Sequence, residues 1–147
     1  MEGTQSSEVT VLNCPAMAGV FAIQSEVGAD RAADALDGGG AVFLLDTSHA
    51  TNRSEFFDAV AATLPLDPPL HRVHDVWDAL ADSLWEGLHE LGVDEVVILW
   101  SGSDNLRAAD PDEFGIACDV MRDLAGSLGD RTLTVDRPVE VTIYLAE

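Results

Sequence analysis

Lysine is absent from this chain of 147 residues, whose seven basic residues are all arginines. Against them stand 27 Asp and Glu residues, which give a formal net charge of −20 at pH 7. A field of this sign repels nucleic acids and anionic membranes and attracts basic proteins. A high-salt habitat or a GC-rich genome would also produce an acidic chain without lysine. The composition therefore favours a basic partner only if individual acids lie where such a partner would bind.

Cysteines and long apolar runs are also scarce. Cys14 and Cys118 match no zinc-binding spacing, and Cys118 falls in an apolar helical pattern that predicts a small core residue. No apolar run reaches the roughly 18 residues that a membrane span needs. Residues 1–10 contain Glu2 and Glu8 and no basic residue, unlike a secretory signal peptide. We expect a cytoplasmic protein without disulfides or cofactors.

The hydrophobic pattern predicts strands that alternate with helices. The expected strands are 19–23, 41–46, 95–100 and 139–145, and the expected helices are 29–36, 54–64, 75–91 and 110–128. The continuous apolar run 41–46 predicts a strand buried on both faces, and 65–74 and 101–109 are expected to be loops. Strands separated by helices imply a parallel sheet.

The predicted fold class is a small α/β domain. We expect a parallel three-stranded sheet with packed helices over residues 40–147. Residues 1–39 would form an N-terminal β-α extension, and about the first 15 of these residues are expected to be mobile.

Two helices have clear predicted core faces. In the central helix these residues are Trp77, Leu80, Ala81, Leu84, Leu88 and Leu91. In the helix from 110 they are Phe114, Ala117, Cys118, Met121, Leu124, Ala125 and Leu128. The sequence Asp110-Pro111-Asp112-Glu113 predicts a helix start, because it places an N-cap, a proline and a glutamate in the preferred order.

Asp78 and Asp82 stand four residues apart in the central helix, and Glu86 continues the series. At this spacing the side chains share one face, where like charges cost roughly 0.2–0.5 kcal/mol. Asp78 lies in the first turn, where a carboxylate also stabilises the helix dipole, and Asp82 could belong to a solvated face. No arginine lies within one turn on that face. Together the two acids suggest a cationic partner.

Enzymatic interpretations of the same region are weaker. A metal site of Asp78, Asp82 and His71 or His74 would lack the further oxygen ligands that hard cations need. The segment 101–104 follows a strand but lacks the G-x-S-x-G elbow of a hydrolase. We therefore predict that the chain is not an enzyme.

The segment 77–84, W-D-A-L-A-D-S-L, resembles the W-D-A-L-x-D-x-L helix of the barstar family, the intracellular inhibitors of barnase-like ribonucleases. Other stretches follow in the family's order, and the resemblance covers roughly residues 40–147. These stretches are 41–46, 56–65, 98–100, 120–123 and 141–143.

The resemblance implies an inhibitor that plugs the active site of a basic secreted ribonuclease, as an immunity protein or antitoxin. Asp78 and Asp82 would take the place of RNA phosphates, and Asp123 would pair with a basic residue at the rim. Asp75, His74 and Trp77 would make flanking contacts.

The segment 72–76 departs from the family pattern, in which an aromatic-glycine turn and an asparagine precede the helix. This loop normally contacts the enzyme. An acidic module that binds a different basic protein or toxin therefore stays open as an alternative.

Overall fold

The computed structural model describes residues 20–146 except 24, 68 and 70–75. The elements within that part follow in the order β1 (Val20–Ile23), α2 (Ser25–Asp37), β2 (Ala41–Asp46), α3 (Arg53–Thr63), α4 (Trp77–His89), β3 (Glu95–Ser101), α5 (Ser103–Ala109), α6 (Pro111–Leu128) and β4 (Glu140–Ala146). The alternation of strands and helices is as predicted, apart from the additional helix α5. The segment expected to be mobile lies outside the described residues.

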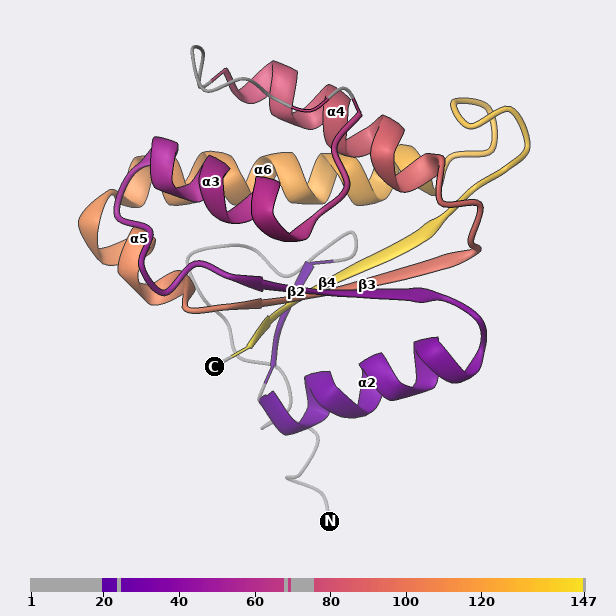
Figure 1. Ribbon diagram of the computed structural model, residues 1–147, viewed down its shortest axis with the longest axis horizontal. Helices are drawn as coiled ribbons and strands as arrows, with labels where there is room; N and C mark the ends of the chain where they lie inside the picture. Colours follow the sequence, from indigo (N-terminus) through magenta and orange to yellow (C-terminus); the bar gives the residue numbers. More distant parts are fainter. Residues whose placement is uncertain (1–19, 24, 68, 70–75, 147) are drawn as a thin grey trace.

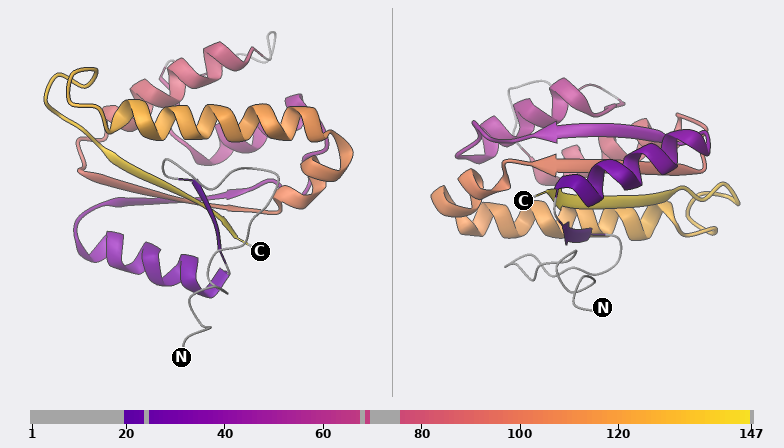
Figure 2. Two further views of the ribbon diagram at one scale, coloured as in Figure 1. Left: turned by 180° about the vertical axis from the view of Figure 1, so that it is seen from behind. Right: turned by 90° about the horizontal axis from the view of Figure 1, so that it is seen from below.

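The four strands form one parallel sheet in the order β1-β4-β3-β2. Strands β2, β3 and β4 make the predicted three-stranded parallel sheet, and β1 adds a fourth strand beside β4. Helices α3, α4 and α6 lie on one face of the sheet, and α2 lies on the other (Figures 1 and 2). The N-terminal β-α unit therefore extends the sheet and covers its second face.

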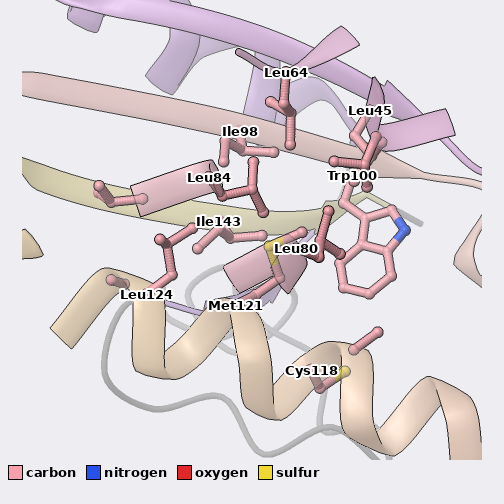
Figure 3. Packing of buried hydrophobic residues seen from close by; sticks show 14 of the residues in the cluster. Leu45, Leu64, Leu80, Leu84, Ile98, Trp100, Cys118, Met121, Leu124 and Ile143 are labelled. Carbon is pink, nitrogen blue, oxygen red and sulfur yellow. The ribbon is translucent and has the colours of Figure 1, made fainter. Parts of the chain in front are cut away.

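The main core lies between the sheet and helices α3, α4 and α6. Leu80 and Leu84 of α4 point toward Ile98 of β3, Ile143 of β4 and Met121 of α6 (Figure 3), and all of these side chains are fully buried. Burial of an aliphatic side chain of this size is worth about 1.5–3 kcal/mol. Helix α4 is therefore fixed to the sheet along its inner side.

The prediction that β2 is buried on both faces is wrong. β2 is an edge strand paired only with β3, and Leu44 is 65% exposed. Val42, on the same face, packs against a small core made by Ala32 and Ala35 of α2 and Val97 of β3. Helix α2 covers one end of the strand and leaves the other end in solvent.

Residues 103–109, predicted as loop, form α5. With only seven residues, α5 is too short to show a hydrophobic period. Its start depends on Gly102, whose φ is +71° and where a Cβ would lie 2.5 Å from the Ser48 nitrogen. Leu106 of α5 is fully buried in the main core.

The polar residues at the ends of β2 and β3 stabilise turns. The Trp100 indole N–H donates to Thr47 Oγ1 at 2.9 Å, and the Thr47 hydroxyl donates to the Ser101 carbonyl at 3.2 Å. The Ser48 backbone N–H donates to the Asp46 carboxylate. These contacts connect the turns that follow the two strands.

The predicted start and core face of α6 are confirmed. Asp110 accepts a hydrogen bond from the Glu113 backbone N–H, Pro111 stands in the first turn, and every residue of the predicted face is buried. In α3, Phe56, Phe57, Val60 and Leu64 are buried as the pattern indicates.

Candidate functional site

Helix α4 is shorter than the predicted 75–91. It begins at Trp77 and ends at His89, and Gly92, with φ +71°, turns the chain into β3. Leu80, Leu84 and Leu88 are fully buried, as predicted. The prediction for Leu91 is wrong: the residue follows the helix end and is 39% exposed.

The opposite side of α4 is acidic. Asp78, Asp82, Glu86 and Glu90, here called the acidic face, are all exposed and follow one another at four-residue steps. Within the described part of the chain, Asp78 and Asp82 form no hydrogen bond or ion pair. The two carboxylates therefore remain available to a cation from outside.

Four arginines form ion pairs with acids outside the acidic face. Their pairs are Arg53 with Glu113, Arg107 with Asp104, Arg122 with Asp119 and Arg131 with Asp136. None of these acids belongs to the acidic face, so the pairing leaves the face's charge intact.

Two indole hydrogen bonds hold α4 on α6. The Trp77 Nε1–H donates to Glu113 Oε1 at 3.0 Å, and the Trp85 Nε1–H donates to the Ser127 hydroxyl oxygen at 2.8 Å. The first joins the starts of the two helices and the second joins positions near their ends, so the helices run in the same direction. Asp78 and Asp82 lie between these two bonds in sequence, on a helix that is attached to α6 at both positions.

The Trp77 side chain is directed toward the core, whereas a residue that serves mainly as a partner contact would be exposed. Its ring packs against Phe56 at a centroid distance of 5.6 Å and against Phe57 at 5.0 Å. Its indole N–H is already bound to Glu113. The structure therefore supports the predicted core role of Trp77, which is half-buried and packed against the main core.

Asp123 is exposed on α6, the helix that packs against α4. The neighbouring Arg122 binds Asp119 at 2.6 Å rather than Asp123. Within the described part of the chain Asp123 has no ion pair, so it remains open to a partner. The candidates Asp75 and His74 lie outside the described residues.

Glu90, at the C-terminal end of the acidic face, forms a pair with a second acid, Asp67. The side chain of Asp67, from the segment after α3, hydrogen-bonds Glu90, and the pKa of Glu90 is raised by this bond and by repulsion from Asp67. The Asp67 backbone N–H donates to the Ser83 carbonyl, which ties the segment to α4. Extending the four-residue series would have found Glu90, but no pattern pointed to Asp67.

We predict that Glu90→Gln raises the free energy of unfolding at pH 7, because it removes a repelled charge and leaves an amide that can donate to Asp67. Since the pKa of Glu90 is raised, the folded state holds its proton to higher pH than the unfolded chain, and stability falls as the pH rises through that pKa. The gain should shrink as the pH falls to about 4 and below, where the carboxyl becomes mostly protonated in both states.

Urea unfolding at both pH values measures this effect. Glu55→Gln is the control of opposite sign, because Thr51 donates to Glu55 and lowers its pKa, so that variant should lose stability at pH 7. A Glu90→Gln variant that is less stable than the parent at pH 7 would contradict the repulsion.

Two hollows in the surface do not include the exposed acids of the acidic face. One of about 810 Å³ lies between His89, the segment 92–94, the end of α6 and the segment 136–142, and one of about 330 Å³ lies beside Asp46 and His49. No group of three or more His, Cys, Asp or Glu side chains in the described part of the chain could hold a metal ion. The acidic face is therefore an exposed helix surface, and Asp78 and Asp82 line neither of these hollows.

Most of the chain matches one known protein family. The family described as Barstar (barnase inhibitor) matches residues 40–144. The chain belongs to the barstar family. The match runs from the start of β2 into β4 and so contains α3, α4 and α6, whereas β1 and α2 lie outside it.

No curated protein and no solved structure matches the chain. None of the described helices is long and apolar enough to cross a lipid bilayer. The family assignment thus depends on the barstar match together with the parallel sheet and the packed helices.

Proposed function

We propose that this member of the barstar family is an intracellular inhibitor of a basic, secreted, barnase-like ribonuclease, acting as an immunity protein or antitoxin. The observation that supports this most is the pair Asp78 and Asp82, exposed and unpaired among the described residues on a helix whose other side is buried. The chain would act by occupying an active site, so it needs neither a catalytic group nor a cofactor.

The chemistry of the target explains the choice of residues. A ribonuclease must present cationic side chains where RNA phosphates bind, and carboxylates one helical turn apart, with Cβ atoms about 5–6 Å from each other, can meet two such groups. The net charge of −20 would steer a basic enzyme toward the chain and raise the association rate.

The remaining candidates would contribute at the edge of the contact. Asp123 would pair with a basic residue at the rim of the active site; it is exposed on α6, the helix that packs against α4. Asp75 and His74, which precede α4, and the outer edge of Trp77 would make flanking contacts.

Titration of the purified chain into barnase that is cleaving RNA tests the proposal. We expect inhibition that saturates near one inhibitor per enzyme and an association rate that falls as salt is added, because exposed charges are screened. RNA cleavage that continues undiminished in excess inhibitor, with no binding by calorimetry, would contradict barnase as a target.

A second candidate is a barstar-like module for another basic protein, such as a different toxin. The observation behind it is the segment 72–76, which lacks the family's aromatic-glycine turn and asparagine and contains Arg72. A pull-down from the native host, followed by an RNA-cleavage assay on the basic protein recovered, distinguishes the two functions.

A further inference from the structure

Among the described residues, no side chain caps the first turn of α4. Its N-cap residue is Val76, whose side chain cannot accept a hydrogen bond from the free backbone N–H groups of the turn. The first bonded amide is that of Leu80, which donates to the Val76 carbonyl. An uncapped helix end frays unless packing holds it. Asp78 lies in this turn, so its position depends on contacts from outside α4.

The outside contact is supplied by Glu113 of α6. Its Oε1 accepts from the Trp77 indole N–H at 3.0 Å and from Arg53 Nε at 2.8 Å, and its Oε2 accepts from Arg53 Nη2 at 2.8 Å. Only 15% of the Glu113 side chain is exposed. The Arg53 guanidinium, at the start of α3, also lies 5.9 Å from the centre of the Trp77 ring.

The carboxylate of Glu113 is not required to begin its own helix. Asp110 caps α6 by accepting from the Glu113 backbone N–H, a contact that does not involve the Glu113 side chain. The side chain is therefore free to join the starts of α3, α4 and α6. Arg53 lowers the pKa of Glu113, which keeps the acceptor charged.

We infer that Glu113 is a positioning residue for the acidic face. By binding the Trp77 indole, it fixes the first turn of α4 and hence Asp78. This inference rests on the proposed function, because it assigns Glu113 a role in binding through Asp78. In this role Glu113, of which 15% of the side chain is exposed, would act without touching the partner. Without the Glu113 carboxylate, Asp78 would lie on a turn that moves. Binding to a nuclease would then be weaker by the free energy needed to order that turn.

The first experiment needs no partner. Hydrogen exchange of the backbone amides of Leu80, Ala81 and Asp82 is compared between the full-length parent and Glu113→Ala. We expect exchange in this turn to become about tenfold faster, because a hydrogen bond to a charged group is lost. Glu113→Gln should restore most of the protection, since its amide oxygen can still accept from Trp77.

Ser127→Ala is the matched control, because it removes the other indole hydrogen bond, to Trp85. We expect it to leave exchange at 80–82 unchanged. Unchanged exchange in Glu113→Ala, or equal acceleration throughout α4, would overturn the inference, since either shows that Glu113 does not act on the first turn.

The second experiment measures inhibition of barnase by a double-mutant cycle. Glu113→Ala should weaken inhibition about tenfold, mainly through faster dissociation. In an Asp78→Ala background that loss should nearly vanish, whereas in an Asp123→Ala background it should persist in full. Additive effects of Glu113→Ala and Asp78→Ala would overturn the positioning role.

The two experiments fail separately. If the parent chain does not inhibit barnase, the proposed target is contradicted. The exchange measurement still decides whether Glu113 holds the first turn of α4.

Discussion

Asp82→Ala is expected to weaken inhibition of the target ribonuclease by more than about tenfold. In the complex, Asp82 would lie against cationic groups that normally bind phosphate, and truncation would leave those groups buried without a counter-charge. The stability of the unbound protein should not fall. Asp82 is exposed, it has no ion pair within the described part of the chain, and alanine has a higher helix propensity than aspartate.

The measurement is an inhibition constant against a ribonuclease that the parent chain inhibits, together with a urea unfolding curve. Asp34→Ala is the matched control: Asp34 is exposed on α2, on the other face of the sheet, and its loss changes the net charge equally. We expect Asp34→Ala to bind as the parent does. An unchanged inhibition constant for Asp82→Ala would remove the acidic face from the binding site.

The elements that sequence reasoning placed well are those with a long periodic pattern and a marked start. α6 has both: Asp110 and Pro111 define its beginning, and the apolar residues of its predicted core face recur at three- and four-residue steps and are all buried. α5 has neither, and its helix is set by the turn at Gly102 and by burial of Leu106. Such short helices are fixed by tertiary contacts that no local pattern encodes.

The edge position of β2 was missed for a related reason. An apolar run such as 41–46 indicates that a strand is buried but does not say on how many sides. The order β1-β4-β3-β2 places β2 at the edge, and this order depends on pairings between residues far apart in the chain. Leu44 is exposed because of that order and not because of its own neighbours in sequence.

The acidic face was predictable because helical spacing alone places Asp78 and Asp82 together. Its support was not. Glu113 fits a capping box, in which its side chain would return to the Asp110 backbone, yet the side chain binds Arg53 and Trp77 instead. The competing partners come from two other helices. Local chemistry identified the residues that would meet a partner, and only the packing of three helices shows what holds them.

Gly87→Ala is expected to destabilise the fold by about 3 kcal/mol, although glycine within a helix normally costs stability. Gly87 is buried in α4. A Cβ there would lie 2.2 Å from the Pro65 carbonyl oxygen and 2.6 Å from the Pro65 carbonyl carbon. Both are backbone atoms of the segment that leaves α3, so neither can turn aside as a side chain would.

Gly115→Ala is the control for this prediction. Gly115 also lies within a helix, α6, but a Cβ there would meet nothing within 4 Å. That substitution should raise the free energy of unfolding by roughly 0.5–1 kcal/mol, the usual gain in helix propensity. Urea unfolding of both variants compares the two signs, and a stabilised Gly87→Ala would show that α4 does not lie so close to Pro65.

The close approach at Gly87 also bears on the acidic face. It brings the chain after α3 against α4, where the Asp67 backbone N–H can donate to the Ser83 carbonyl and the Asp67 carboxyl can meet Glu90. A methyl group at Gly87 should separate the two, so Gly87→Ala should return the pKa of Glu90 toward its ordinary value. NMR titration of Glu90 in a variant that is still folded measures this. A Glu90 titration unchanged by Gly87→Ala would show that the Asp67 contact does not depend on the close packing of Pro65 against α4.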